Sequence, residues 1–203
     1  MLRINIFSVR LSVSFWALLP VSFAVVSSVG GQQLVLICLL CTIVHEAGHL
    51  VMICRYRGRP DSISVYPFEI RINSDLTCVT AKEELFIVSF GIIFNLLLSA
   101  VAGLLYLAFP DYLLLEIAFS SLCIGLLNLI PAESFDGGQL FRMILLRFFS
   151  QKVSDLILNV ISMIMILPLT VVGVAVMFLS QYNFSVLFIA LFLISIYISK
   201  ELR

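Results

Sequence analysis

The chain has 203 residues, of which 62% are hydrophobic and only 12% charged, and its formal net charge is zero. Soluble domains carry about a quarter charged residues. This composition, with a mean hydropathy of +1.16, therefore excludes an ordinary soluble domain and indicates an integral membrane protein. A net charge of zero gives no electrostatic reason to expect binding to nucleic acid, and we expect no nucleic-acid partner.

Six apolar segments approach the roughly 20 residues that a membrane-spanning helix needs. They run, in chain order, over about Leu11–Val29, Leu34–Cys54, Leu85–Phe109, Leu113–Ile130, Leu156–Leu179 and Ser185–Ser199. A secretory signal is the alternative for the first segment, but its apolar run is long for a signal core. The predicted fold is an α-helical polytopic membrane protein with about six transmembrane helices.

The basic residues support this count. All twelve Lys and Arg residues precede the first segment, follow the sixth, or lie between the second and third or the fourth and fifth. The positive-inside rule then places both termini in the cytoplasm. The polar stretch 56–81 is the only long one, and its part Ile63–Ile72 has β-branched and aromatic residues in partial alternation. We expect a small membrane-associated β element there, between the second and third helices.

The second segment contains His45-Glu-Ala-Gly-His49, an HExxH motif formed by the only two histidines of the chain. Residues four apart lie on one face of a helix, so both imidazoles can bind one zinc ion. Glu46 is then in reach of a water molecule as general base. Incidental polar residues are the alternative, but such groups are costly in lipid without a partner.

A hydrolytic zinc site usually has three protein ligands, and the sequence leaves several candidates for the third. A carboxylate on the cytoplasmic side is required, and the candidates are Asp136, Glu133, Asp61, Glu69 and Glu83. Asp136 stands out because Pro131 ends the fourth segment and Gly137-Gly138 permits a sharp turn after it; a solvated turn aspartate is the alternative. Cys38 and Cys41 could instead ligate zinc, but a Cys₂His₂ site would be closed and structural.

The combination of motifs resembles the site-2 protease family of intramembrane metalloproteases. It rests on His45–His49, on Asn128-x-x-Pro131 followed by Asp136-Gly-Gly, and on Gly91-Ile-Ile-Phe-Asn95 as a G-x-x-x-N element. The small size is most similar to the sporulation-type branch, whose members cut membrane-tethered precursors. The resemblance implies one Zn²⁺ per chain, held by His45, His49 and Asp136, with Glu46 activating water.

The resemblance has further implications. Asn95 and Asn128 would hold the substrate strand or its scissile carbonyl, and the alternative for both is helix packing. The expected partners are a membrane-spanning or membrane-tethered protein substrate and a regulatory membrane protein, and the expected location is a bacterial cell membrane. We expect one domain over 1–203, with a catalytic core over about 30–146, accessory helices over about 154–199, and no PDZ or CBS domain. Glu133 departs from the family pattern, in which prolines are common at this point.

The sequence leaves two rival functions open. A membrane-anchored zincin would carry its HExxH in a soluble catalytic domain, whereas here the motif lies in an apolar segment. A transporter or silent scaffold would show several intramembrane polar groups along a path, whereas here they are concentrated around one motif.

Overall fold

The computed structural model describes residues 2–6, 9–13, 33–58, 62–65, 70–73, 79–133 and 135–179. The chain divides into two compact units, Met1–Leu127 and Asn128–Arg203, and each is described by itself. The single domain expected over 1–203 stays a prediction.

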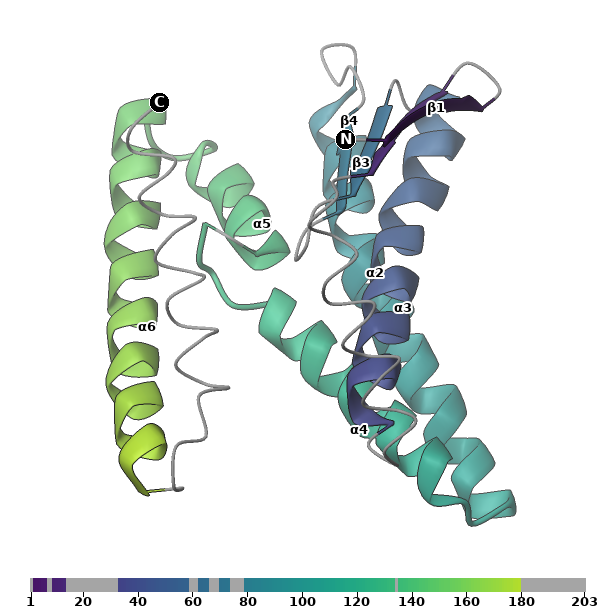
Figure 1. Ribbon diagram of the computed structural model, residues 1–203. Helices are drawn as coiled ribbons and strands as arrows, with labels where there is room; N and C mark the ends of the chain where they lie inside the picture. Colours follow the sequence, from purple (N-terminus) through teal and green to yellow (C-terminus); the bar gives the residue numbers. More distant parts are fainter. Residues whose placement is uncertain are drawn as a thin grey trace. The chain divides into compact units, whose positions relative to one another are not determined.

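The described residues of the first unit contain three apolar helices. They are α2 (Leu34–Arg57), α3 (Ala81–Ala108) and α4 (Tyr112–Asn128, whose last residue begins the second unit). Helices α2 and α3 pack along each other (Figure 1). Gly48 makes this possible, because a side-chain carbon at this position would collide with the carbonyl oxygen of Phe90. Buried Met52 and Ile53 of α2 pack against Ile87 of α3 in a hydrophobic cluster.

A four-stranded sheet completes the first unit. Its strands are β1 (Leu2–Ile6), β2 (Val9–Val13), β3 (Ser62–Val65) and β4 (Ile70–Asn73), in the order β1-β2-β3-β4. Strand β2 runs antiparallel to β1 and parallel to β3, and β3 runs antiparallel to β4. The strands predicted between the second and third helices are thus present as β3 and β4, and the hairpin β1–β2 adds to them.

The start of the first predicted span is wrong. Leu11–Val13 belong to β2, where Leu11 pairs with Ile63 and Val13 with Val65. The apolar, β-branched residues here satisfy a helix span and a strand equally well, and pairing with a distant segment decides for the strand. The rest of this span and the sixth span, Ser185–Ser199, lie outside the described residues.

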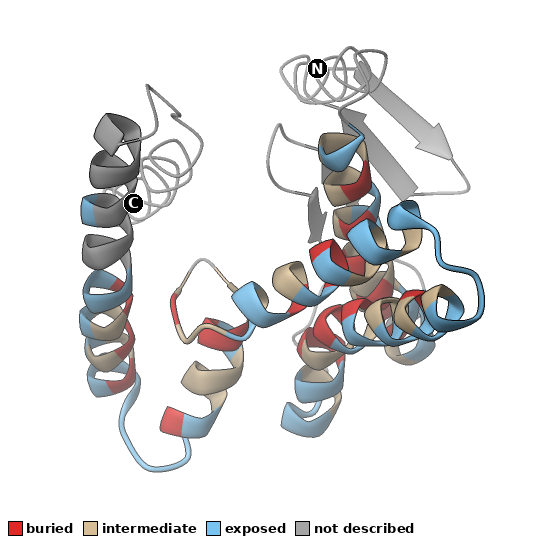
Figure 2. Ribbon diagram, turned by 90° about the horizontal axis from the view of Figure 1, so that it is seen from below, coloured by how far each residue is buried: buried red, intermediate tan, exposed pale blue. Residues whose placement is uncertain are grey.

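The helices of the first unit carry their large apolar side chains outward. Exposed residues run along α3 and α4 (Figure 2), and Leu97, Leu104 and Leu107 are among them. The buried set instead includes polar side chains, namely His45, Asn95, Ser120 and Ser121. Two of the described helices, Leu34–Tyr56 and Ala81–Ala108, are long and apolar enough to cross a membrane. Apolar surface outside with polar groups inside is the pattern expected for helices in lipid.

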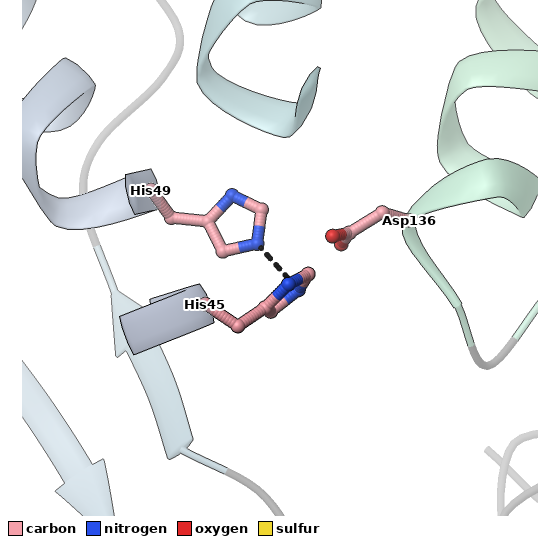
Figure 3. Close-up of side chains that lie close together, drawn as sticks. All are labelled: His45, His49 and Asp136. Atoms are coloured by element: carbon pink, nitrogen blue, oxygen red, sulfur yellow. Dashed lines mark hydrogen bonds between the residues drawn. The ribbon is translucent and has the colours of Figure 1, made fainter. Parts of the chain in front are cut away.

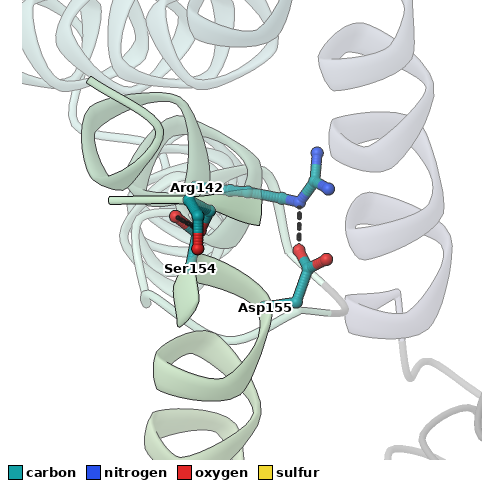
Figure 4. Close-up of polar contacts among 4 residues, drawn as sticks. Arg142, Ser154 and Asp155 are labelled. Carbon is teal, nitrogen blue, oxygen red and sulfur yellow. Dashed lines mark hydrogen bonds and ion pairs between the residues drawn. The ribbon is translucent and has the colours of Figure 1, made fainter. Parts of the chain in front are cut away.

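The second unit contains α5 (Asp136–Leu145) and α6 (Gln151–Leu179). Arg142 of α5 donates from Nε to Oδ1 of Asp155 on α6 at 2.8 Å (Figure 4). Both side chains are about two-fifths exposed, at 38% and 44%, so this ion pair contributes little to stability. Helix α6 also carries two fully buried serines, Ser154 and Ser162.

Candidate metal centre

His45 and His49 lie one helical turn apart on α2, as the HExxH spacing predicts. Their Nε2 atoms are 3.2 Å apart, and the two rings meet edge to face with centroids 4.9 Å apart (Figure 3). His45 is only 4% exposed. The pair therefore presents two ring nitrogens to one point inside the first unit.

The outer nitrogen of each ring contacts a group on α3. Nδ1 of His49 lies 2.8 Å from the carbonyl oxygen of Ile87. A carbonyl oxygen can only accept, so this Nδ1 carries the proton and Nε2 presents its lone pair. Nδ1 of His45 lies 3.3 Å from the side-chain amide of Asn95, which is fully buried. A second ring nitrogen that donates to a carbonyl oxygen, as in His49, is typical of histidines that bind a metal.

Gly91 leaves the space that the two rings occupy. A side-chain carbon at this position would collide with the His49 ring, and it would lie 2.9 Å from Cε1 of His45. Gly91 and Asn95 are one turn apart on α3, so both face the histidines. The G-x-x-x-N element thus combines a close approach to the rings with a polar contact to one of them.

Glu46 follows His45 on α2 and is half-buried. It therefore lies in the stretch of helix between the two histidines, as the HExxH motif requires. Its proposed role as a general base depends on its position beside the two histidines.

Asp136 is the first residue of α5. A carboxylate is favoured at this position by the partial positive charge of a helix N-terminus. The sharp turn predicted after it is wrong, because Gly137 and Gly138 continue the helix. Side chains at these two positions would collide with the carbonyl oxygens of Leu129 and Ala132 respectively. The glycine pair is thus required by the preceding loop, which passes directly over the first turn of α5.

Ser162 of α6 holds this loop. Its hydroxyl accepts from the backbone N–H of Glu133 at 2.9 Å and donates to the carbonyl oxygen of Leu158 at 2.8 Å. We expect Ser162→Ala to lower the free energy of unfolding by about 0.5–1.5 kcal/mol, because the Glu133 N–H loses this hydrogen bond.

Ser154→Ala is the matched control for this change. Ser154 is also fully buried on α6 and donates to the carbonyl oxygen four residues earlier, that of Ser150, at 3.1 Å. Denaturant unfolding in detergent measures both variants. Equal losses of stability would show that the contact to the loop contributes nothing.

The remaining predicted residues are placed as follows. Asn128 is the last residue of α4 and is half-buried. Cys38 and Cys41 are free thiols on α2, and neither belongs to the group of candidate metal ligands found among the described residues. The sequence pattern identified Gly91 only as part of the G-x-x-x-N element, and it gave no role to Ser162. Small residues in otherwise apolar helices were the one available signal for them.

No protein-family model matches the sequence, and no curated protein matches it either. The structure is similar to that of the site-2 protease from Methanocaldococcus jannaschii, with a TM-score of 0.70 and 21% sequence identity. The similarity covers 95% of this chain and 91% of the other. The chain therefore has the fold of a site-2 protease, and the resemblance drawn from its motifs is confirmed at the level of the fold.

Proposed function

We propose that this chain, with its site-2 protease fold, is a zinc metalloendopeptidase that hydrolyses membrane-tethered proteins within or near the bilayer. The observation that carries the proposal is the pair of converging Nε2 atoms of His45 and His49, 3.2 Å apart. Two ligands about 2.0–2.1 Å from one tetrahedral zinc ion are about 3.3–3.4 Å from each other. The histidine pair fits that geometry closely.

Asp136 is the proposed third ligand. The family resemblance implies that Asp136 joins His45 and His49 in holding the metal. Two imidazoles and a carboxylate are a donor set typical of catalytic zinc sites, which leave the fourth position open. When bound, zinc would polarise a carbonyl group and lower the pKa of a water molecule.

Glu46 would take the proton from the attacking water and pass it to the amine that leaves. The attacked peptide must be locally unwound, because a helical carbonyl already accepts a hydrogen bond and is covered by its neighbours. The outer strands of the sheet, β1 and β4, offer a surface on which an extended segment could pair by strand addition. The substrate-binding roles of Asn95 and Asn128 stay predictions of the family resemblance.

The proposed topology is a multi-pass membrane protein with cytoplasmic termini. Arg3 and Arg10 lie in β1 and β2, and Arg71 lies in β4. Backbone pairing joins these strands in one sheet, which supports a topology with the N-terminal segment and the segment between α2 and α3 on one side of the membrane. This agrees with the distribution of basic residues, which favours the cytoplasmic side. Bacterial origin and a regulatory membrane partner remain expectations from the resemblance.

The test is cleavage of a panel of co-expressed, epitope-tagged single-span proteins by the wild-type chain and by Asp136→Asn. We expect the variant to bind zinc more weakly, by about 100-fold or more, and to lose cleavage at limiting zinc, because replacing a charged ligand by a neutral amide should exceed the 10- to 100-fold loss typical of one outer contact. Zinc affinity is measured on the purified full chain by competition with a chelator.

Asp155→Asn is the matched control, since it makes the same chemical change in the same unit at the exposed ion pair with Arg142 (Figure 4). It should keep wild-type zinc affinity and cleavage. Wild-type affinity in Asp136→Asn would exclude this residue as a ligand. A wild-type chain that purifies without zinc would contradict the proposed function.

A further inference from the structure

The side chain of Asn95 lies between two groups of different helices. One end of its amide contacts Nδ1 of His45 on α2 at 3.3 Å, and the other contacts Oγ of Ser121 on α4 at 3.4 Å. Asn95 and Ser121 are both fully buried. All three residues belong to the first unit.

The orientation of this amide decides which nitrogen of His45 carries the proton. In the structure Nδ2 of Asn95 faces Nδ1 of His45. That nitrogen must then accept, so the proton lies on Nε2 and is donated to Nε2 of His49. In this state the Nε2 lone pair of His45 is not available to a metal. An amide turned by 180° places Oδ1 against Nδ1, which then carries the proton and frees Nε2.

Ser121 distinguishes these two orientations. Its single hydroxyl proton is donated to the backbone carbonyl oxygen of Asn95 at 2.9 Å. Towards the Asn95 side chain the hydroxyl can therefore only accept, and the amide NH₂ group is the matching partner. With its one proton on the shorter contact, the Ser121 hydroxyl makes both of its contacts to Asn95 as hydrogen bonds only when the amide is turned.

We propose that Ser121 and Asn95 are positioning residues that hold His45 in its Nδ1–H tautomer, with Nε2 ready to bind zinc. His49 needs no such device, because the carbonyl oxygen of Ile87 already fixes its proton on Nδ1. The Asn95 amide thus acts as a two-position switch, and Ser121 biases it towards the metal-binding state. The inference rests on the proposed zinc site, and it assigns Asn95 a task besides substrate binding.

Ser121→Ala tests the inference, with Ser99→Ala as the control. Ser99 also links α3 to α4, by donating to the carbonyl oxygen of Ala118 at 2.8 Å, and it lies one turn from Asn95. Nitrogen-15 labelling of the two histidines of the chain reports the tautomer in metal-free protein in detergent. We expect His45 to be mainly Nδ1–H in wild type and Ser99→Ala, and to shift towards Nε2–H in Ser121→Ala.

Zinc affinity provides the second measurement. It should fall about 10-fold in Ser121→Ala and remain unchanged in Ser99→Ala, since the loss of such outer contacts typically weakens binding 10- to 100-fold. In an Asn95→Asp background both oxygens accept, so removing the Ser121 hydroxyl should have no further effect. A purely structural role for Ser121 would lower affinity equally in both backgrounds.

Two outcomes overturn the inference: a wild-type His45 in the Nε2–H tautomer, or a tautomer that Ser121→Ala does not change. If the tautomers behave as expected but the wild type binds no zinc, the proposed function fails and the positioning of His45 stands. If the chain binds zinc and cleaves while the tautomer is insensitive to Ser121, only the inference fails.

Discussion

Glu46→Gln is expected to lower the cleavage rate by about 10²- to 10⁴-fold while zinc affinity stays unchanged. The amide is close in shape to the carboxylate but cannot take a proton from water, and general-base catalysis contributes about this factor. Glu46 is next to His45 on α2 and is not one of the candidate ligands, so metal binding should not suffer. Cleavage of a tagged single-span protein and chelator competition measure the two quantities.

The control for this variant is Glu116→Gln, which makes the same change at an exposed position of α4. It should cleave like the wild type. Cleavage that survives Glu46→Gln would refute the mechanism, whereas a parallel loss of zinc would show that Glu46 supports the metal rather than the proton transfer.

Gly91→Ala is expected to weaken zinc binding by about 100-fold or more and to abolish cleavage at ordinary zinc concentrations. The added methyl group would occupy the position of the His49 ring and crowd the ring of His45. His49 can move aside only by giving up its 2.8 Å contact to the carbonyl oxygen of Ile87. Both proposed nitrogen ligands are thus displaced, which should exceed the 10- to 100-fold loss typical of one outer contact.

Gly103→Ala separates this effect from the general effect of alanine in a helix. Gly103 is also on α3, and a side-chain carbon there meets nothing within 4 Å. This variant should keep wild-type zinc affinity, and it should gain up to about 1 kcal/mol of stability from the better helix former. Full zinc affinity in Gly91→Ala would show that the metal is not bound between these histidines.

The sequence by itself determined the helices that are long and apolar. Segments Leu34–Cys54, Leu85–Phe109, Leu113–Ile130 and Leu156–Leu179 correspond to α2, α3, α4 and α6 within a few residues. It also determined the histidine pair on one face of α2. Both results depend only on composition and on the 3.6-residue period of the helix, which are local properties.

The tertiary structure alone decided the features that depend on distant partners. Val9–Val13 became a strand because β3, some fifty residues later, pairs with it. Gly137 and Gly138 leave space for the preceding loop, whose carbonyl oxygens would collide with side chains there. The proton of His49 is fixed on Nδ1 by the carbonyl oxygen of Ile87, on another helix. The β3 strand and the Ile87 carbonyl are remote in sequence from their partners, so local pattern could identify the candidate ligands but not the contacts that prepare them.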